Sequence, residues 1–195
     1  MPKNKKPNTL KDIGKAHATY ERMRREIIGR SNGALSKSKR AIFAMHRNDL
    51  KGASEHLKEA LHIFKESEAK FKDWPALKYE GAYKAALEEY AEALLFEQFL
   101  KTGKFDLLEK RVMDHGTYLA ALSDATGEVV RYAIREATAG RYDSVKVATS
   151  TVEKVIEFLL GLDLSGYLRT KFDQAKKNLR NLEQVMYEIS MRKNS

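Results

Sequence analysis

Residues 82–100 read AYKAALEEYAEALLFEQFL, and this stretch decides the fold. At 100° per residue its apolar side chains cover nearly the whole circumference, which indicates a helix enclosed by protein on most sides. Glu89 and Glu92 are three residues apart, so they share one face of that helix. A carboxylate among apolar side chains is costly unless it is paired, protonated or bound to a metal ion. The two glutamates therefore either pair with lysines across a helix contact or form half of an acidic metal site.

The bulk composition excludes several classes of protein. The chain has 195 residues, enough for a sizeable core, and no cysteine, so disulfides and thiolate metal sites are excluded. No apolar run reaches transmembrane length and no signal sequence opens the chain, so we expect a cytoplasmic protein without a membrane partner.

The net charge of +9 is unevenly distributed. Residues 1–80 hold 19 Lys/Arg and 10 Asp/Glu, whereas residues 81–195 hold 17 of each. A positive surplus confined to the N-terminal part indicates a polyanion-binding surface. The alternative is charge that only maintains solubility.

Helical periodicity continues outward from residues 82–100 to both ends of the chain. We expect a disordered basic arm at 1–8. Trp74-Pro75 should end the second helix, with Pro75 in the first turn of the next one. The expected helices cover 9–47, 49–72, 76–101, 106–112, 117–138, 143 or 144 to 160, and 165–192. Asn48-Asp49 offers the N-cap of the second, Asp143 or Ser144 caps the sixth, and Gly161 ends it. No strand is indicated. The sequence therefore predicts an all-α, single-domain bundle of six to seven antiparallel helices over 9–195.

The first expected helix has a basic face opposite its apolar residues. That face carries Arg22, Arg25, Arg30, Lys37, Arg40 and Arg47. Such side chains suit phosphate contact because each displaces condensed counterions from a nucleic acid. Arg22, Arg25 and Arg40 are therefore candidates for nucleic-acid binding, although many exposed helices carry a similar face.

A second acidic pair lies on the helix expected at 117–138. Asp124 and Glu128 are four residues apart and share a face. One interpretation is a solvated stripe of ion pairs. Taken with Glu89 and Glu92, however, three or four carboxylates would converge if the two helices packed side by side. Such a site suits Mg²⁺ or Mn²⁺ and phosphodiester chemistry.

Four motifs resemble the translin and Trax (translin-associated factor X) family. EYAEA at 89–93 is similar to the Trax motif E-Y-V-E-A, and Tyr118-Leu119 with DATGE at 124–128 is similar to Y-L…D-L-T-G-E. TAGRY at 138–142 and VMYEISMR at 185–192 resemble T-A-G-D-Y of translin and the family's closing V-V-Y-D-L-S-I-R. The chain is identified as a Trax-like member, because translin lacks the E-x-x-E pair.

The resemblance implies a translin-like helical fold and a hollow octameric shell that holds single-stranded nucleic acid. It also implies Mg²⁺-dependent endoribonuclease activity, since Trax's catalytic acidic residues fall on Glu89, Glu92, Asp124 and Glu128. The mid-chain basic-histidine motif of translin is not matched in this chain, so that binding site is not carried over.

We therefore expect a homo-octameric endoribonuclease that binds single-stranded RNA or DNA. Glu89, Glu92 and Asp124 would ligate the metal, with Glu128 as a fourth ligand or as the base that positions a water. Arg131 and Arg135 would hold substrate phosphates or balance the acidic charge. The alternatives are a non-catalytic, single-stranded nucleic-acid-binding oligomer of translin type and a helical protein–protein adaptor.

Overall fold

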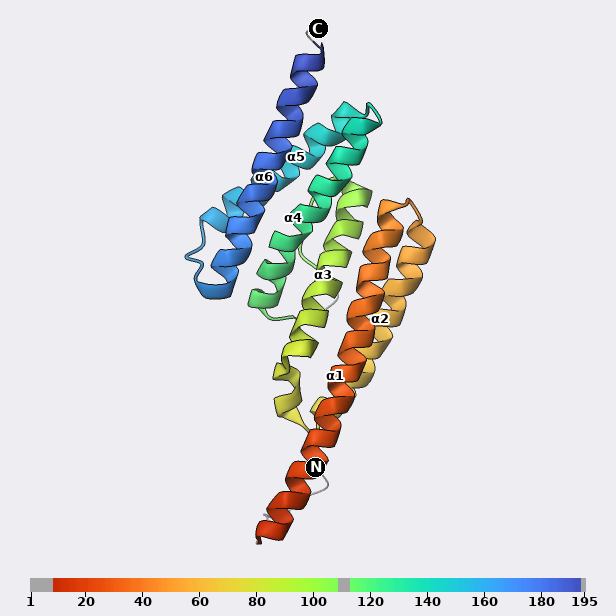
Figure 1. The fold of residues 1–195 in the computed structure, drawn as a ribbon, viewed down its shortest axis with the longest axis vertical. Coiled ribbons are helices and arrows are strands. Elements are labelled where there is room, and N and C mark those ends of the chain that lie inside the picture. The colour runs from red at the N-terminus through yellow and green to blue at the C-terminus, as the bar shows by residue number, and fades with distance from the viewer. Residues whose placement is uncertain (1–8, 109–112, 194–195) are drawn as a thin grey trace. The chain divides into compact units, whose positions relative to one another are not determined.

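The computed structural model describes residues 9–108 and 113–193, and it is all-α over those ranges, without a strand. The α-helices are α1 (Leu10–His46), α2 (Leu50–Phe71), α3 (Gly81–Thr102), α4 (His115–Thr138), α5 (Tyr142–Leu160) and α6 (Gly166–Lys193), with a short 3₁₀ helix η1 (Pro75–Tyr79) before α3 (Figure 1). The expected all-α class is confirmed. The predicted arm at 1–8 lies outside the described residues.

The chain divides into two compact units, Met1–Tyr90 and Ala91–Ser195. Their boundary falls inside α3 and not at a linker. The expected single domain over 9–195 therefore stays a prediction. No helix within the described ranges is long and apolar enough to cross a membrane.

In the first unit, α1 and α2 form an antiparallel hairpin (Figure 1). Buried residues recur along α1 at alternating spacings of four and three, and many of them are small: Ile27, Ser31, Ala34, Ser38, Ala41 and Met45. The facing stripe of α2 is similar: Ala53, Leu57, Ala60, Phe64 and Ser67. Small side chains let two helices approach closely in a coiled-coil-like seam. The buried hydroxyls of Ser31, Ser38 and Ser67 donate to carbonyls of their own helices, so the seam leaves them satisfied.

The turn between α1 and α2 contains the N-cap that the sequence predicted for α2. Asn48 adopts a positive φ of 63°, which asparagine tolerates better than most residues. Asp49 is the N-cap of α2, and its Oδ1 accepts a hydrogen bond from the Gly52 N–H at 2.9 Å. The cap predicted at this position is confirmed.

In the second unit, α4, α5 and α6 pack against one another around a core that also includes residues of α3 (Figure 1). The core members are Ala91, Leu95, Ala121, Leu122, Ala125, Val155, Leu159 and Phe172. A hydrogen bond also crosses this interior: the buried Asn178 amide donates to Thr126 Oγ1 at 2.8 Å. It joins α6 to α4 through the predicted motif at 124–128.

Two predicted helix boundaries are wrong. Pro75 begins η1 and not a helix over 76–101, because Glu80 is extended and α3 starts only at Gly81. The segment Asp106–Leu108 is not helical, and the rest of the helix predicted at 106–112 lies outside the described residues. The Asp106 N–H donates instead to Gln98 Oε1 at 2.8 Å, which ties this segment to α3.

The start of α5 also differs in detail from the prediction. Arg141, rather than Asp143 or Ser144, is the N-cap residue, and Tyr142 is the first helical residue. The chain reverses before it through Gly140, whose φ of 74° suits glycine. Asp143 then lies in the first turn of α5, where a negative charge is favourable.

Candidate functional site

One exposed stripe runs along most of α1. Its members are Arg22, Arg25, Gly29, Asn32, Ser36, Lys39, Arg40, Phe43 and Arg47, and we call it the α1 stripe. The three predicted nucleic-acid residues, Arg22, Arg25 and Arg40, all belong to it. Within the described part of the chain these three guanidinium groups make no ion pair. Their charge is therefore directed to solvent.

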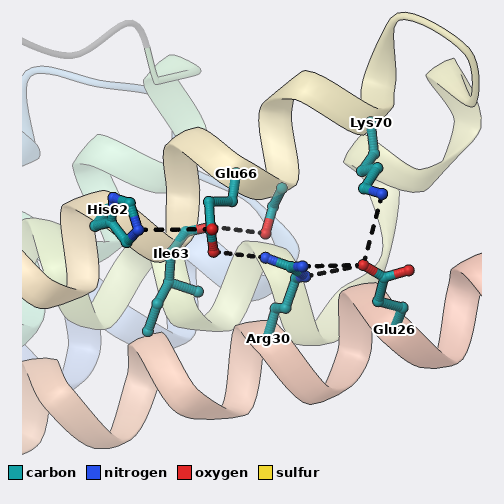
Figure 2. A network of polar contacts seen from close by, with 7 residues as sticks. Glu26, Arg30, His62, Ile63, Glu66 and Lys70 are labelled. Atoms are coloured by element: carbon teal, nitrogen blue, oxygen red, sulfur yellow. Dashed lines mark hydrogen bonds and ion pairs between the residues drawn. The ribbon is translucent and has the colours of Figure 1, made fainter.

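Arg30 and Lys37 do not belong to this stripe, although the sequence placed them on the same basic face. Arg30 donates to Glu26 on α1 at 3.1 Å and to Glu66 on α2 at 2.6 Å (Figure 2). Lys70 approaches Glu26 and His62 approaches Glu66 in the same network. Lys37 pairs separately with Glu59 on α2 at 2.6 Å. Both cations hold the hairpin together, because they project from the side of α1 that faces α2.

A hollow of about 580 Å³ lies where the α1 stripe meets the turn into α2. Its lining includes Lys39, Arg40, Phe43 and Arg47 of the stripe. From α2 and its cap come His56 and Asp49. Three cations of α1 therefore contribute to this lining, and an aromatic ring lies among them.

Glu89 lies on α3 in the first unit and is 20% exposed. The ammonium nitrogen of Lys39 lies 3.9 Å from Glu89 Oε2, so a lysine of α1 approaches this carboxylate. That contact agrees with the lysine-pairing interpretation of the glutamates. Glu92, one turn further along α3, is also partly buried.

Asp124 of α4 forms an ion pair with Lys171 of α6. Both side chains are partly buried, with Asp124 24% and Lys171 19% exposed. Glu128, one turn on, lies 3.9 Å from the Arg131 guanidinium of its own helix. The motif at 124–128 therefore contacts α6 both through the Asp124–Lys171 pair and through the hydrogen bond between Asn178 and Thr126.

Among residues 9–108 and 113–193, no group of three or more acidic or histidine side chains is arranged to hold a metal ion. The donor set is chemically suited to Mg²⁺, since carboxylate oxygens are its preferred ligands. Asp124 is engaged with Lys171, whose ammonium group a bound metal ion would have to displace. The proposed roles of Glu89, Glu92, Asp124 and Glu128 remain predictions.

Arg131 and Arg135 are exposed on α4. Arg131 lies near Glu128, and the choice between phosphate contact and charge balance stays a prediction. Further along, Glu136 accepts two hydrogen bonds from Arg141, at 2.5 Å from Nε and 2.6 Å from Nη2. These hydrogen bonds hold the pKa of the Glu136 carboxyl below its ordinary value.

The sequence interpretation missed three residues here. Lys171 and Asn178 interrupt the apolar stripe of α6, and polar residues at inner positions are the signal that could have found them. Phe43 is the reverse case, an apolar ring within a basic face.

Residues 21–193 match the sequence model of the Translin family. Among solved structures, apo-NeC3PO is 25% identical, with a TM-score of 0.83, and the alignment covers 94% of this chain and 98% of that chain. AfC3PO in complex with duplex RNA is 21% identical, with a TM-score of 0.85 and coverage of 94% and 97%. AfC3PO alone is 22% identical, with a TM-score of 0.81 and coverage of 95% and 99%. Comparison with curated protein sequences gave no match.

Proposed function

The chain belongs to the Translin family, and we propose that it is a self-assembling protein that binds single-stranded nucleic acid along the α1 stripe. The observation that carries this proposal is the stripe itself, whose arginines are directed to solvent. Each such cation displaces counterions from a phosphate, which gives affinity without dependence on base sequence.

The length of the stripe suits a strand of several nucleotides. From Arg22 to Arg47, at the rise of an α-helix, it extends about 37 Å. The intervening stripe positions Gly29, Asn32 and Ser36 are small or polar, so a strand can approach the helix surface between the cations. By contrast, the pairing of Arg30 and Lys37 with acidic residues removes them from this surface.

The relatives support binding to RNA but leave the form of the strand to experiment. AfC3PO, which shares the fold, forms a complex with duplex RNA. Single-strand selectivity in the present chain is therefore part of the proposal, and duplex and single-stranded RNA of equal length should be compared directly.

The test is retention of labelled RNA at low salt by the wild type and by a triple variant, Arg22→Ala/Arg25→Ala/Arg40→Ala. We expect the triple variant to bind about tenfold more weakly or worse. The matched control is Lys154→Ala/Lys177→Ala/Arg180→Ala, which removes three exposed cations of the second unit. Equal weakening by both variants would show that net charge alone matters. Failure of the wild type to retain RNA would reject nucleic-acid binding and leave the protein–protein adaptor as the remaining interpretation.

A second candidate is Mg²⁺-dependent endoribonuclease activity of Trax type. Glu89, Glu92, Asp124 and Glu128 match the acidic positions of the Trax motifs, and all four are partly rather than fully buried. The pairing of Asp124 with Lys171 weighs against it, because a metal ion would have to displace that ammonium group. Binding without catalysis is therefore the function that the geometry supports better.

A cleavage assay separates the two candidates. Labelled single-stranded RNA is incubated with Mg²⁺ or with EDTA, using wild type and Glu92→Gln/Asp124→Asn. Cleavage that needs Mg²⁺ and disappears in the double variant would support the nuclease. Undiminished cleavage by that variant would rule out the acidic site, and intact RNA bound by the wild type would leave the binding function alone.

Self-assembly is the remaining part of the proposal. The resemblance implies a homo-octamer, so light scattering should give eight times the chain mass of 22.3 kDa. A mass corresponding to one chain would rule out a closed shell.

A further inference from the structure

We propose that Phe43 is a base-stacking platform, so that the α1 stripe binds the bases of a single strand as well as its phosphates. The inference rests on the proposed nucleic-acid binding and adds a second kind of contact to it. Arg40 and Arg47 are the cations that would hold the neighbouring phosphates.

Phe43 is 58% exposed, although burial of a phenylalanine side chain would be favourable. A single exposed apolar residue is common and by itself needs no explanation. Its neighbours distinguish this one, because each other position of the α1 stripe is basic, polar or glycine. An aromatic ring within a basic groove is the combination by which proteins bind single strands without sequence preference.

Helix geometry places the ring between cations. Arg40 lies three residues before Phe43 and Arg47 four residues after it, so all three project from one face. The two arginines are about 10 Å apart along the helix axis. A strand that follows the stripe would therefore have phosphates near both guanidinium groups and a base over the ring between them.

The hollow beside Phe43 offers space for a base. Its volume is about 580 Å³, and its lining includes Leu35 and Ala44 in addition to the ring and the cations. The carboxylate in this lining, Asp49, is engaged as the N-cap of α2. Glu59, the partner of His56 beside the hollow, is also paired with Lys37. These engagements reduce the repulsion that an approaching phosphate would meet.

Stacking on an exposed ring favours single strands, because the bases of a duplex are already stacked on one another. The aromatic face accepts any base, so the site should add affinity and selectivity for single strands but no base preference. It should also add affinity that does not depend on salt, since no counterion is released by stacking.

The experiment measures the affinity of a short fluorescent uridine RNA for wild type, Phe43→Leu and Phe43→Trp by anisotropy. Leucine keeps an apolar side chain but removes the aromatic face, so we expect binding to weaken roughly 5- to 100-fold. The slope of log affinity against log salt should stay unchanged. Tryptophan should retain wild-type affinity, and in a Trp74→Phe background its emission should be quenched by RNA.

Two comparisons make the result specific. Phe158→Leu alters an exposed phenylalanine of the second unit, 51% exposed, and should leave RNA affinity unchanged. Inorganic polyphosphate carries the charge of RNA without bases, so wild type and Phe43→Leu should bind it equally. Circular dichroism and light scattering confirm that the variants fold and assemble like the wild type.

Equal RNA affinity of wild type and Phe43→Leu would overturn the stacking platform while leaving the proposed function intact. An equal loss of polyphosphate and RNA binding would also overturn it, because the effect would then not depend on bases. No RNA binding by the wild type itself would instead reject the proposed function.

Discussion

The ion pair of Asp124 and Lys171 joins α4 to α6 at a partly buried position. The two charges of such a pair attract each other more strongly than those of an exposed pair, because solvent screens them less. We expect a double-mutant cycle of Asp124→Asn and Lys171→Met to give a coupling free energy of about 1 kcal/mol. Urea unfolding in EDTA measures it, so that no metal contributes. Additivity of the two changes would show that the carboxylate and the ammonium group do not stabilise each other.

The Glu136 carboxyl makes the stability of the fold depend on pH. Hydrogen bonds from Arg141 lower its pKa in the folded protein below the ordinary 4.5, so the stabilisation is present above that pH and is lost as pH falls through the folded value. Glu136→Gln should cost about 1 kcal/mol of unfolding free energy at neutral pH, since Arg141 is largely exposed.

The measurement for Glu136 is urea unfolding at neutral and acidic pH. The difference between wild type and Glu136→Gln should shrink as the pH falls below the ordinary 4.5. Glu153→Gln, a change at an exposed glutamate of α5, is the control and should show no such convergence. A constant difference across the range would mean that the Glu136 carboxyl titrates at its ordinary pKa.

At the scale of single residues, the sequence indicated which side chains were unusual but not what they contact. The four carboxylates were identified from their spacing and from the resemblance. Two of them meet a cation from another helix: Lys39 of α1 approaches Glu89, and Lys171, 47 positions away in the sequence, pairs with Asp124. Helical periodicity assigns a residue to a face of its own helix and contains no information on which helix faces it.

Among the elements, the α1–α2 hairpin has a seam of small residues. Ala60 is fully buried in it, so Ala60→Leu should overpack the seam and lower the free energy of unfolding by about 1–3 kcal/mol. Chemical denaturation measures the change. Lys58→Leu, on the exposed side of the same helix, is the matched control and should change stability little. An equally stable Ala60→Leu variant would mean that α1 and α2 separate easily.

Helix positions were largely predictable because capping residues and glycines mark them. Asp49 and Gly161 lie at helix ends as the sequence indicated. The error at Pro75 has a physical reason: proline suits the first turn of a 3₁₀ helix as well as that of an α-helix, and the sequence does not distinguish them. Asp106 was assigned to a helix, whereas its backbone N–H donates to a side chain of α3.

For the whole molecule, the distribution of charge was the most informative feature of the sequence, because it can be counted without knowledge of the fold. Part of the N-terminal surplus lies along the α1 stripe, and another part holds α1 to α2 through Arg30 and Lys37. The predicted metal site required side chains of separate helices to converge. Neither charge counts nor periodicity determines that arrangement.

The most direct test of nucleic-acid binding along the α1 stripe is the salt dependence of RNA affinity. Log affinity falls linearly with log salt, by about 0.7 for each phosphate that the protein neutralises on a single strand. Arg22→Ala/Arg25→Ala/Arg40→Ala should therefore reduce the slope by about 2, and Lys154→Ala/Lys177→Ala/Arg180→Ala should leave it as in the wild type. A wild-type slope in the first variant, or an equal reduction in both, would contradict binding along α1.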